Sequence, residues 1–165
     1  MPRFRRYGLI GLVLAAATIL TGCGAGTVAL EPAADANNPL CAEVSVRLPK
    51  SFESVGGSEP QQRRWTNAQA TGAWGDPESV YLRCGVEPPG PSTLQCVTFG
   101  GVDWLVDSED RPWLRITTYG RTPAVQVTVN SSVISADSVL DRLTSAVGRL
   151  PTDARCIAAD EAPSE

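Results

Sequence analysis

The chain has 165 residues, a net charge of −4 at pH 7, five cysteines and no histidine. The lack of histidine excludes mechanisms that rely on a histidine base, and it removes the commonest ligand of zinc hydrolases. The acidic balance argues against nucleic-acid binding, which needs clustered lysine and arginine.

The N-terminal region has the pattern of a bacterial lipoprotein signal peptide. Three arginines precede an apolar run, Gly8 to Leu20, and small residues lead to Cys23. Such a run is typical of secretory signals and is shorter than the roughly 20 residues that span a bilayer. A cysteine at the cleavage point can receive a diacylglyceryl group. We expect residues 1–22 to be removed and Cys23 to anchor the protein on the extracytoplasmic face of the cell membrane; an ordinary signal peptide cut near Ala25 is the alternative.

The rest of the chain predicts one domain between two polar segments. Removal of the signal peptide would leave eleven basic and eighteen acidic residues, so the net charge would change from −4 to −7. Residues 23–38 contain no aromatic side chain, and we expect a lipidated N-terminus followed by a flexible tether. Residues 39–157 have the size of a single domain, and residues 158–165 predict a disordered tail.

The first element of the domain is predicted to be a short helix. Asn38 and Pro39 resemble an N-cap and the first helical residue. Leu40, Val44 and Leu48 recur every four residues, although this valine-rich segment would also suit a strand. Further along the chain, residues 64–67 suggest a short edge strand, and the Ala-Trp-Gly-Asp-Pro sequence at 73–77 is predicted to be a turn.

Alternating apolar residues then predict five strands, at about 79–86, 94–99, 102–107, 112–119 and 124–129. If both apolar faces point into one core, Trp104 can lie opposite Leu114. An apolar stripe at helical spacing predicts a helix over 135–149. The expected fold is α+β, with a single antiparallel sheet of about five strands, helices packed on one face and two disulfides.

Four cysteines other than Cys23 predict two disulfides in an oxidising compartment. If residues 79–86 and 94–99 form a hairpin, Cys84 lies opposite Cys96. Cys41 is then left to pair with Cys156, near the two ends of the domain. No Cys-x-x-Cys spacing is present, so we expect neither a metal site nor a cofactor.

No group of residues indicates a familiar catalytic mechanism. Acidic residues cluster at 103–110, where a solvated loop is the simplest interpretation. They leave open a small carboxylate-dependent enzyme that acts on cell-wall glycans. The candidate binding surface is instead a patch of arginine and aromatic side chains, suited to a carboxylate, a phosphate or an acidic segment of a partner. Its members are Trp74, Arg83, Tyr119 and Arg121.

Several segments together resemble a known family. They are Cys41 with Leu48-Pro49, Ala73-Trp74-Gly75-Asp76-Pro77, Leu82-Arg83-Cys84-Gly85-Val86, Val102-Asp103-Trp104 and Thr118-Tyr119-Gly120-Arg121-Thr122-Pro123. The family is actinobacterial and is named only as domain of unknown function 3515, with members that are typically lipoproteins or membrane-anchored proteins. The resemblance implies an envelope location but no activity and no catalytic residues.

From these observations we expect a non-enzymatic binding module of the cell envelope. Its membrane attachment would come from the diacylglyceryl group on Cys23. Its partner would be an envelope protein or a wall-associated ligand, and no nucleic acid is expected.

Overall fold

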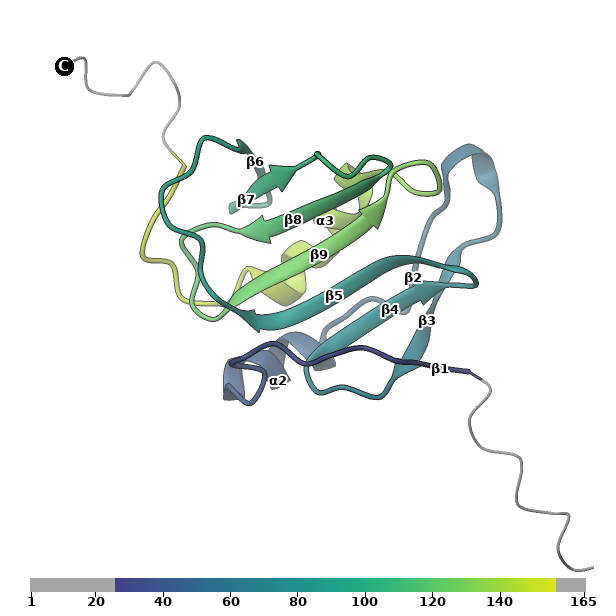
Figure 1. Ribbon diagram of the computed structural model, residues 1–165, viewed down its shortest axis with the longest axis horizontal. Helices are drawn as coiled ribbons and strands as arrows, with labels where there is room; N and C mark the ends of the chain where they lie inside the picture. Colours follow the sequence, from purple (N-terminus) through teal and green to yellow (C-terminus); the bar gives the residue numbers. More distant parts are fainter. Residues whose placement is uncertain (1–25, 157–165) are drawn as a thin grey trace, which may run out of the picture.

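The computed structural model describes residues 26–156, which form a curved sheet with two helices behind it (Figure 1). The expected signal peptide, the lipidation site at Cys23 and the polar tail at 158–165 lie outside the described residues. Neither of the two helices has the length and apolar character required to cross a membrane.

The sheet has nine strands in the described part of the chain, and it is mixed because one pair is parallel. The prediction of an antiparallel sheet of about five strands is therefore wrong. The strand order is β1-β3-β4-β5-β9-β8-β7-β6, with β2 paired to β3 outside this path. The strands are β1 (Thr27–Val28), β2 (Ser51–Phe52), β3 (Gln61–Thr66), β4 (Thr71–Gly75), β5 (Glu78–Val86), β6 (Gln95–Phe99), β7 (Val102–Asp107), β8 (Trp113–Thr118) and β9 (Ala124–Asn130).

Both helices, α2 (Pro39–Val46) and α3 (Ala136–Val147), lie on the same face of the sheet and contact each other. The N-cap prediction for α2 is confirmed, since the Asn38 side chain accepts a hydrogen bond from the Leu40 amide at 3.0 Å. The apolar stripe of α3 is also confirmed, because Val139, Leu143 and Val147 are buried. A short 3₁₀ turn (Val55–Gly57) follows β2.

The core lies between this helical layer and one face of the sheet. Strand β5 contributes Val80 and Leu82, and β9 contributes alternate valines that face the same way. Trp74 of β4 is fully buried there, its ring centroid 4.9 Å from that of Phe52, and its indole donates to the Pro49 carbonyl at 3.0 Å. The opposite face of the sheet carries no helix and is called the open face below.

The disulfides join Cys41 to Cys84 and Cys96 to Cys156. The prediction that four cysteines form two disulfides is confirmed, but the predicted pairs, Cys84 with Cys96 and Cys41 with Cys156, are wrong. Strand β5 pairs with β4 and β9, whereas β6 lies at the far edge of the sheet beside β7. The hairpin that would have placed Cys84 opposite Cys96 therefore does not exist.

The register of the β7–β8 hairpin also differs from expectation. Trp104 lies opposite Thr118, not Leu114, and Val106 lies opposite Ile116. The apolar faces were assigned correctly, since the core side chains of both strands still point to the helices. The loop between the strands is longer than a pairing of Trp104 with Leu114 requires, and it shifts the register without turning either strand over.

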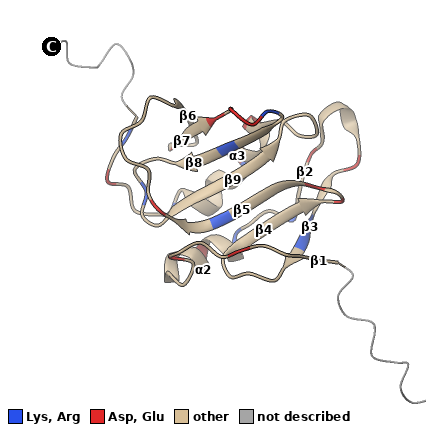
Figure 2. Ribbon diagram, in the orientation of Figure 1, with Lys and Arg blue, Asp and Glu red and all other residues tan. Residues whose placement is uncertain are grey.

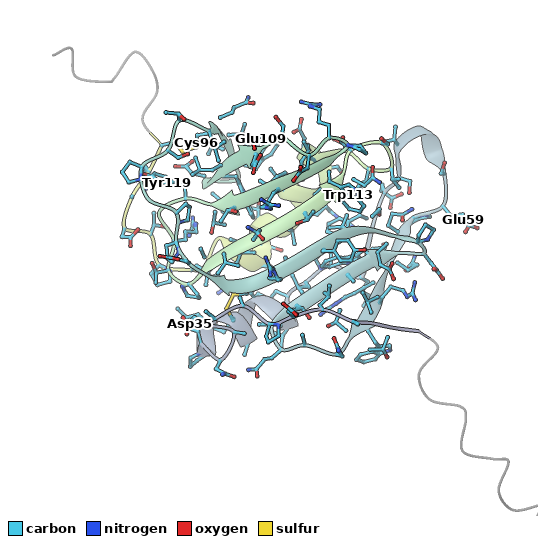
Figure 3. All side chains as sticks on the ribbon, viewed as in Figure 1. Asp35, Glu59, Cys96, Glu109, Trp113 and Tyr119 are labelled. Carbon is cyan, nitrogen blue, oxygen red and sulfur yellow. A yellow bond between two sulfur atoms is a disulfide. The ribbon has the colours of Figure 1, made fainter. Side chains whose placement is uncertain are left out.

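Residues 27–38, which we expected to belong to a flexible tether, instead lie along the sheet. Thr27 pairs with Trp65 of β3, and the Leu30 amide donates to the Asn67 side chain at 2.8 Å. The Asp35 amide donates to the Gly85 carbonyl at 2.9 Å, beside α2 (Figure 3). The described fold thus begins at β1, well before residue 39.

Gly85 should be essential for this attachment. Its φ of +92° suits glycine, and a Cβ there would overlap the backbone of Asp35. We predict that Gly85→Ala lowers the free energy of unfolding by about 2 kcal/mol. It should also speed hydrogen exchange at the Asp35 amide, as measured by NMR.

Gly90→Ala is the matched control, because a Cβ at Gly90 meets no atom within 4 Å. It should change stability by less than about 0.5 kcal/mol. Unchanged exchange at Asp35 in the Gly85 variant would show that the segment does not depend on this contact.

Candidate functional site

The candidate site is a groove of about 360 Å³ on the open face of the sheet. Its floor is built from three neighbouring strands, because side chains on alternate positions of β5, β9 and β8 point away from the core. One side is formed by the N-terminal segment after β1. The lining residues are Ala29, Leu30, Glu31, Tyr81, Arg83, Arg115, Gln126 and Thr128.

The strand register sets the order of the polar side chains in the groove. Arg83 of β5 lies opposite Gln126 of β9, and its guanidinium donates to the Gln126 side-chain oxygen at 2.8 Å. Arg115 of β8 and Tyr81 of β5 both lie opposite Thr128, one on each side of it. The groove floor therefore presents two guanidinium groups, one phenol and neutral hydrogen-bonding groups on a continuous surface, and the N-terminal side adds one carboxylate, Glu31.

The two arginines differ in their electrostatic partners. Arg115 lies 3.6 Å from the Asp107 carboxylate and 3.7 Å from that of Asp110, so its charge is partly neutralised. No ion pair among the described residues includes Arg83. Figure 2 shows basic segments on β3, β5 and β8 across the open face. Arg83 is thus the group in the groove best placed to bind an added anion, since its planar guanidinium can donate two parallel hydrogen bonds to one carboxylate or phosphate.

Tyr81 adds an aromatic surface next to these cations. Its ring centroid lies 5.8 Å from that of Trp113, with the rings tilted by 32°. Burial raises the pKa of Tyr81 above its usual value, and the charge of Glu78 raises this pKa further. The phenol is therefore neutral over a wide pH range and retains its hydroxyl proton as a hydrogen-bond donor.

The structure does not bring the four predicted patch residues together. Trp74 is fully buried in the core, and Arg121 is only 5% exposed. Tyr119 and Arg121 line a second cavity, of about 180 Å³, under the C-terminal segment. Of the predicted set, only Arg83 lies in the groove, and Figure 3 shows Tyr119 and Trp113 at opposite ends of β8.

Arg121 instead fastens α3 to the sheet. Its guanidinium donates to the carbonyls of Gly148 and Leu150, just beyond the helix, and to the Gly101 carbonyl at 3.0 Å. A cation at this position also suits the negative end of the helix dipole. Burial lowers the pKa of Arg121; Asp103 opposes this shift and Arg155 adds to it. The buried Nε atom has no hydrogen-bond partner among the described atoms.

In the described structure, the acidic residues of the 103–110 segment contact different partners. Asp107 and Asp110 contact Arg115, while Asp103 accepts hydrogen bonds from the Thr98 hydroxyl and the Cys156 amide. Each of the two cavities contains a single carboxylate, Glu31 in the first and Asp103 in the second. No cluster of three or more metal-ligating side chains occurs within residues 26–156.

Sequence reasoning missed most of the groove. Arg83 was the only groove residue among the candidates. Tyr81, Arg115, Gln126 and Thr128 were not selected, because isolated polar residues on a strand are typical of any solvated face. Alternation alone assigns these side chains to the same face as Arg83 once β5 and β9 are known to be neighbours. The side formed by residues 29–31 had no sequence signal, since the segment looked like a tether.

Comparison with known proteins identifies one family. The family model described as "Protein of unknown function (DUF3515)" matches residues 8–154. No curated protein and no solved structure matches the chain.

The buried position of Arg121 generates a stability prediction. Arg121→Met should lower the free energy of unfolding by about 2–3 kcal/mol, because carbonyls that receive charged hydrogen bonds would lose their donor. Arg149→Met, at an exposed position next to the same carbonyls, should cost less than about 0.5 kcal/mol. Urea denaturation measures both changes, and equal losses would contradict the role assigned to Arg121.

Proposed function

The chain belongs to the family described as "Protein of unknown function (DUF3515)", and we propose that it is a lipid-anchored, extracytoplasmic binding protein of the cell envelope. The Leu-Thr-Gly-Cys sequence at residues 20–23, after an arginine-containing leader and an apolar run, supports the anchor. Two disulfides within one domain support export to an oxidising compartment.

The function that the groove supports best is binding of an anionic group, without catalysis. The observation that carries this proposal is Arg83, a half-buried cation in the groove that forms no ion pair among the described residues. The hydroxyls and amide around it can complete the hydrogen bonds of a carboxylate or phosphate. Tyr81 and Trp113 offer an aromatic surface for the remainder of the ligand. The ligand is thus an acidic segment of an envelope protein or an acidic wall-associated molecule.

The anchor can be tested directly by mass spectrometry of the protein purified from its native membrane. The mature N-terminal peptide should begin at Cys23 and carry a diacylglyceryl modification. Cys23→Ser should remove the modification and release the protein from the membrane fraction. A mature chain that begins elsewhere, with an unmodified Cys23, would contradict the proposal.

The groove can be tested by crosslinking in living cells. A photoreactive amino acid replacing Thr128 should capture the ligand, because this position lies on the groove floor between Tyr81 and Arg115. We predict that Arg83→Gln abolishes most of this capture while leaving thermal stability unchanged, since Gln126 is the one side-chain hydrogen-bond partner of Arg83 within residues 26–156.

Arg149→Gln is the matched control, as it removes an exposed arginine at the end of α3, outside the groove lining. It should leave capture intact. Equal capture by the wild type and the Arg83 variant would contradict ligand binding in the groove.

A further inference from the structure

Trp65 is the most exposed large apolar side chain in the described residues. Its exposed fraction is 84%, compared with 0% for Trp74 and Trp104. The next most exposed residues of this class are Val46 at 79%, Val55 at 53% and Leu94 at 42%. An indole at this exposure leaves a large apolar area in water, and tryptophan is enriched at interfaces where one end of its ring is apolar and the other is wet.

The place of Trp65 in the fold brings it close to the proposed anchor. Trp65 pairs with Thr27 in the parallel β1–β3 ladder at the edge of the sheet. Thr27 comes only four positions after Cys23 in the chain. A chain of four residues reaches at most about 14 Å, and paired strands lie about 5 Å apart. The backbone of Trp65 must therefore lie within roughly 20 Å of the thiol of Cys23.

The surroundings of Trp65 combine apolar and basic groups. Arg63 lies two residues earlier on the same side of β3, and its guanidinium reaches the Ser45 carbonyl of α2 at 3.5 Å. Val46, the exposed valine, follows Ser45. A hollow of about 430 Å³ runs along β3 and is lined by residues 63–66. We call Val46, Arg63 and Trp65 the tether edge.

We propose that the tether edge rests on the bilayer surface that holds the lipid anchor, with the Trp65 indole at the level of the lipid headgroups. This inference rests on the proposed lipidation of Cys23. Tryptophan favours this depth because its ring is largely apolar while its N–H can bond to water or lipid esters. The arginine can reach lipid phosphates while its stem stays against the protein.

This contact would set the orientation of the whole domain. The tether edge is the β1–β3 side of the sheet, and β6 forms the opposite edge. With β3 at the membrane, the plane of the sheet is roughly perpendicular to the bilayer. The open face, which carries the groove, then faces sideways, in a direction parallel to the membrane surface. The lipid chains supply most of the membrane affinity, and Trp65 fixes the orientation.

The test uses the native lipoprotein, purified in detergent and reconstituted into phosphatidylcholine vesicles with ordinary or brominated acyl chains. Brominated chains quench indoles that reach the bilayer. The difference in fluorescence between the wild type and Trp65→Leu isolates the Trp65 signal from that of the other tryptophans. We expect brominated vesicles to abolish most of this signal and ordinary vesicles to shift it to shorter wavelength.

A swap variant provides the matched control. Leu94 is also exposed but precedes β6 at the opposite edge of the sheet. In the double variant Trp65→Leu/Leu94→Trp, the moved indole should escape quenching. Equal quenching at positions 65 and 94, or none at 65, would overturn the proposed orientation.

Co-flotation of the protein with the vesicles, measured in the same samples, separates this inference from the proposed function. Protein that floats without Trp65 quenching is anchored but does not rest on the tether edge, so only the orientation is wrong. Protein that does not float lacks the anchor, and both proposals then fail.

Discussion

The structure depends on fastening both ends of the domain to one large sheet that has helices on a single face. The Cys41–Cys84 bond joins α2 to the central strand β5, and the Cys96–Cys156 bond joins the C-terminal segment to the edge strand β6. Each bond closes a loop of more than 40 residues, with sequence separations of 43 and 60. Loops of this size restrict the unfolded chain strongly. Two short helices cannot cover nine strands, and the terminal segments pack against the sheet as well. The N-terminal segment forms one side of the groove, and the C-terminal segment covers the second cavity.

Local patterns in the sequence predicted where the helices and strands lie in the chain better than they predicted which strands are adjacent in the sheet. Alternation located β5 to β9, and the apolar stripe located α3, because these signals depend only on which side chains face the core. Strand β4 was missed because Gly75 and the following Asp-Pro pair are typical of a turn, although residues 71–75 are all buried within the sheet. The short strands β1 and β2 exist only through pairing with β3. No local pattern encodes such pairing.

The errors at the cysteines and at the candidate site both come from neighbours in space that local sequence patterns do not show. The cysteine pairing assumed that strands consecutive in sequence lie side by side, which is the common arrangement but not the one between β5 and β6. Once β9 lies between β5 and β8, Arg83 and Arg115 come to share a surface, while Cys84 and Cys96 separate. Trp74 and Arg121 have residue types that suit a binding surface. Their burial follows from contacts with Pro49 and with the end of α3, which are distant in sequence.

The N-terminal segment links the groove to Cys23, the proposed site of lipidation, and lipidation there would narrow the choice of ligand. Glu31 lines the groove only eight residues after Cys23, a contour of at most about 28 Å. The segment is also held to the sheet by the hydrogen bonds of Leu30 and Asp35, so it cannot extend to carry the groove away from the membrane. A ligand fixed deep in the cell wall would lie beyond this reach. The geometry therefore favours an acidic group carried at the membrane surface, and the extracytoplasmic part of another membrane protein meets that requirement most directly.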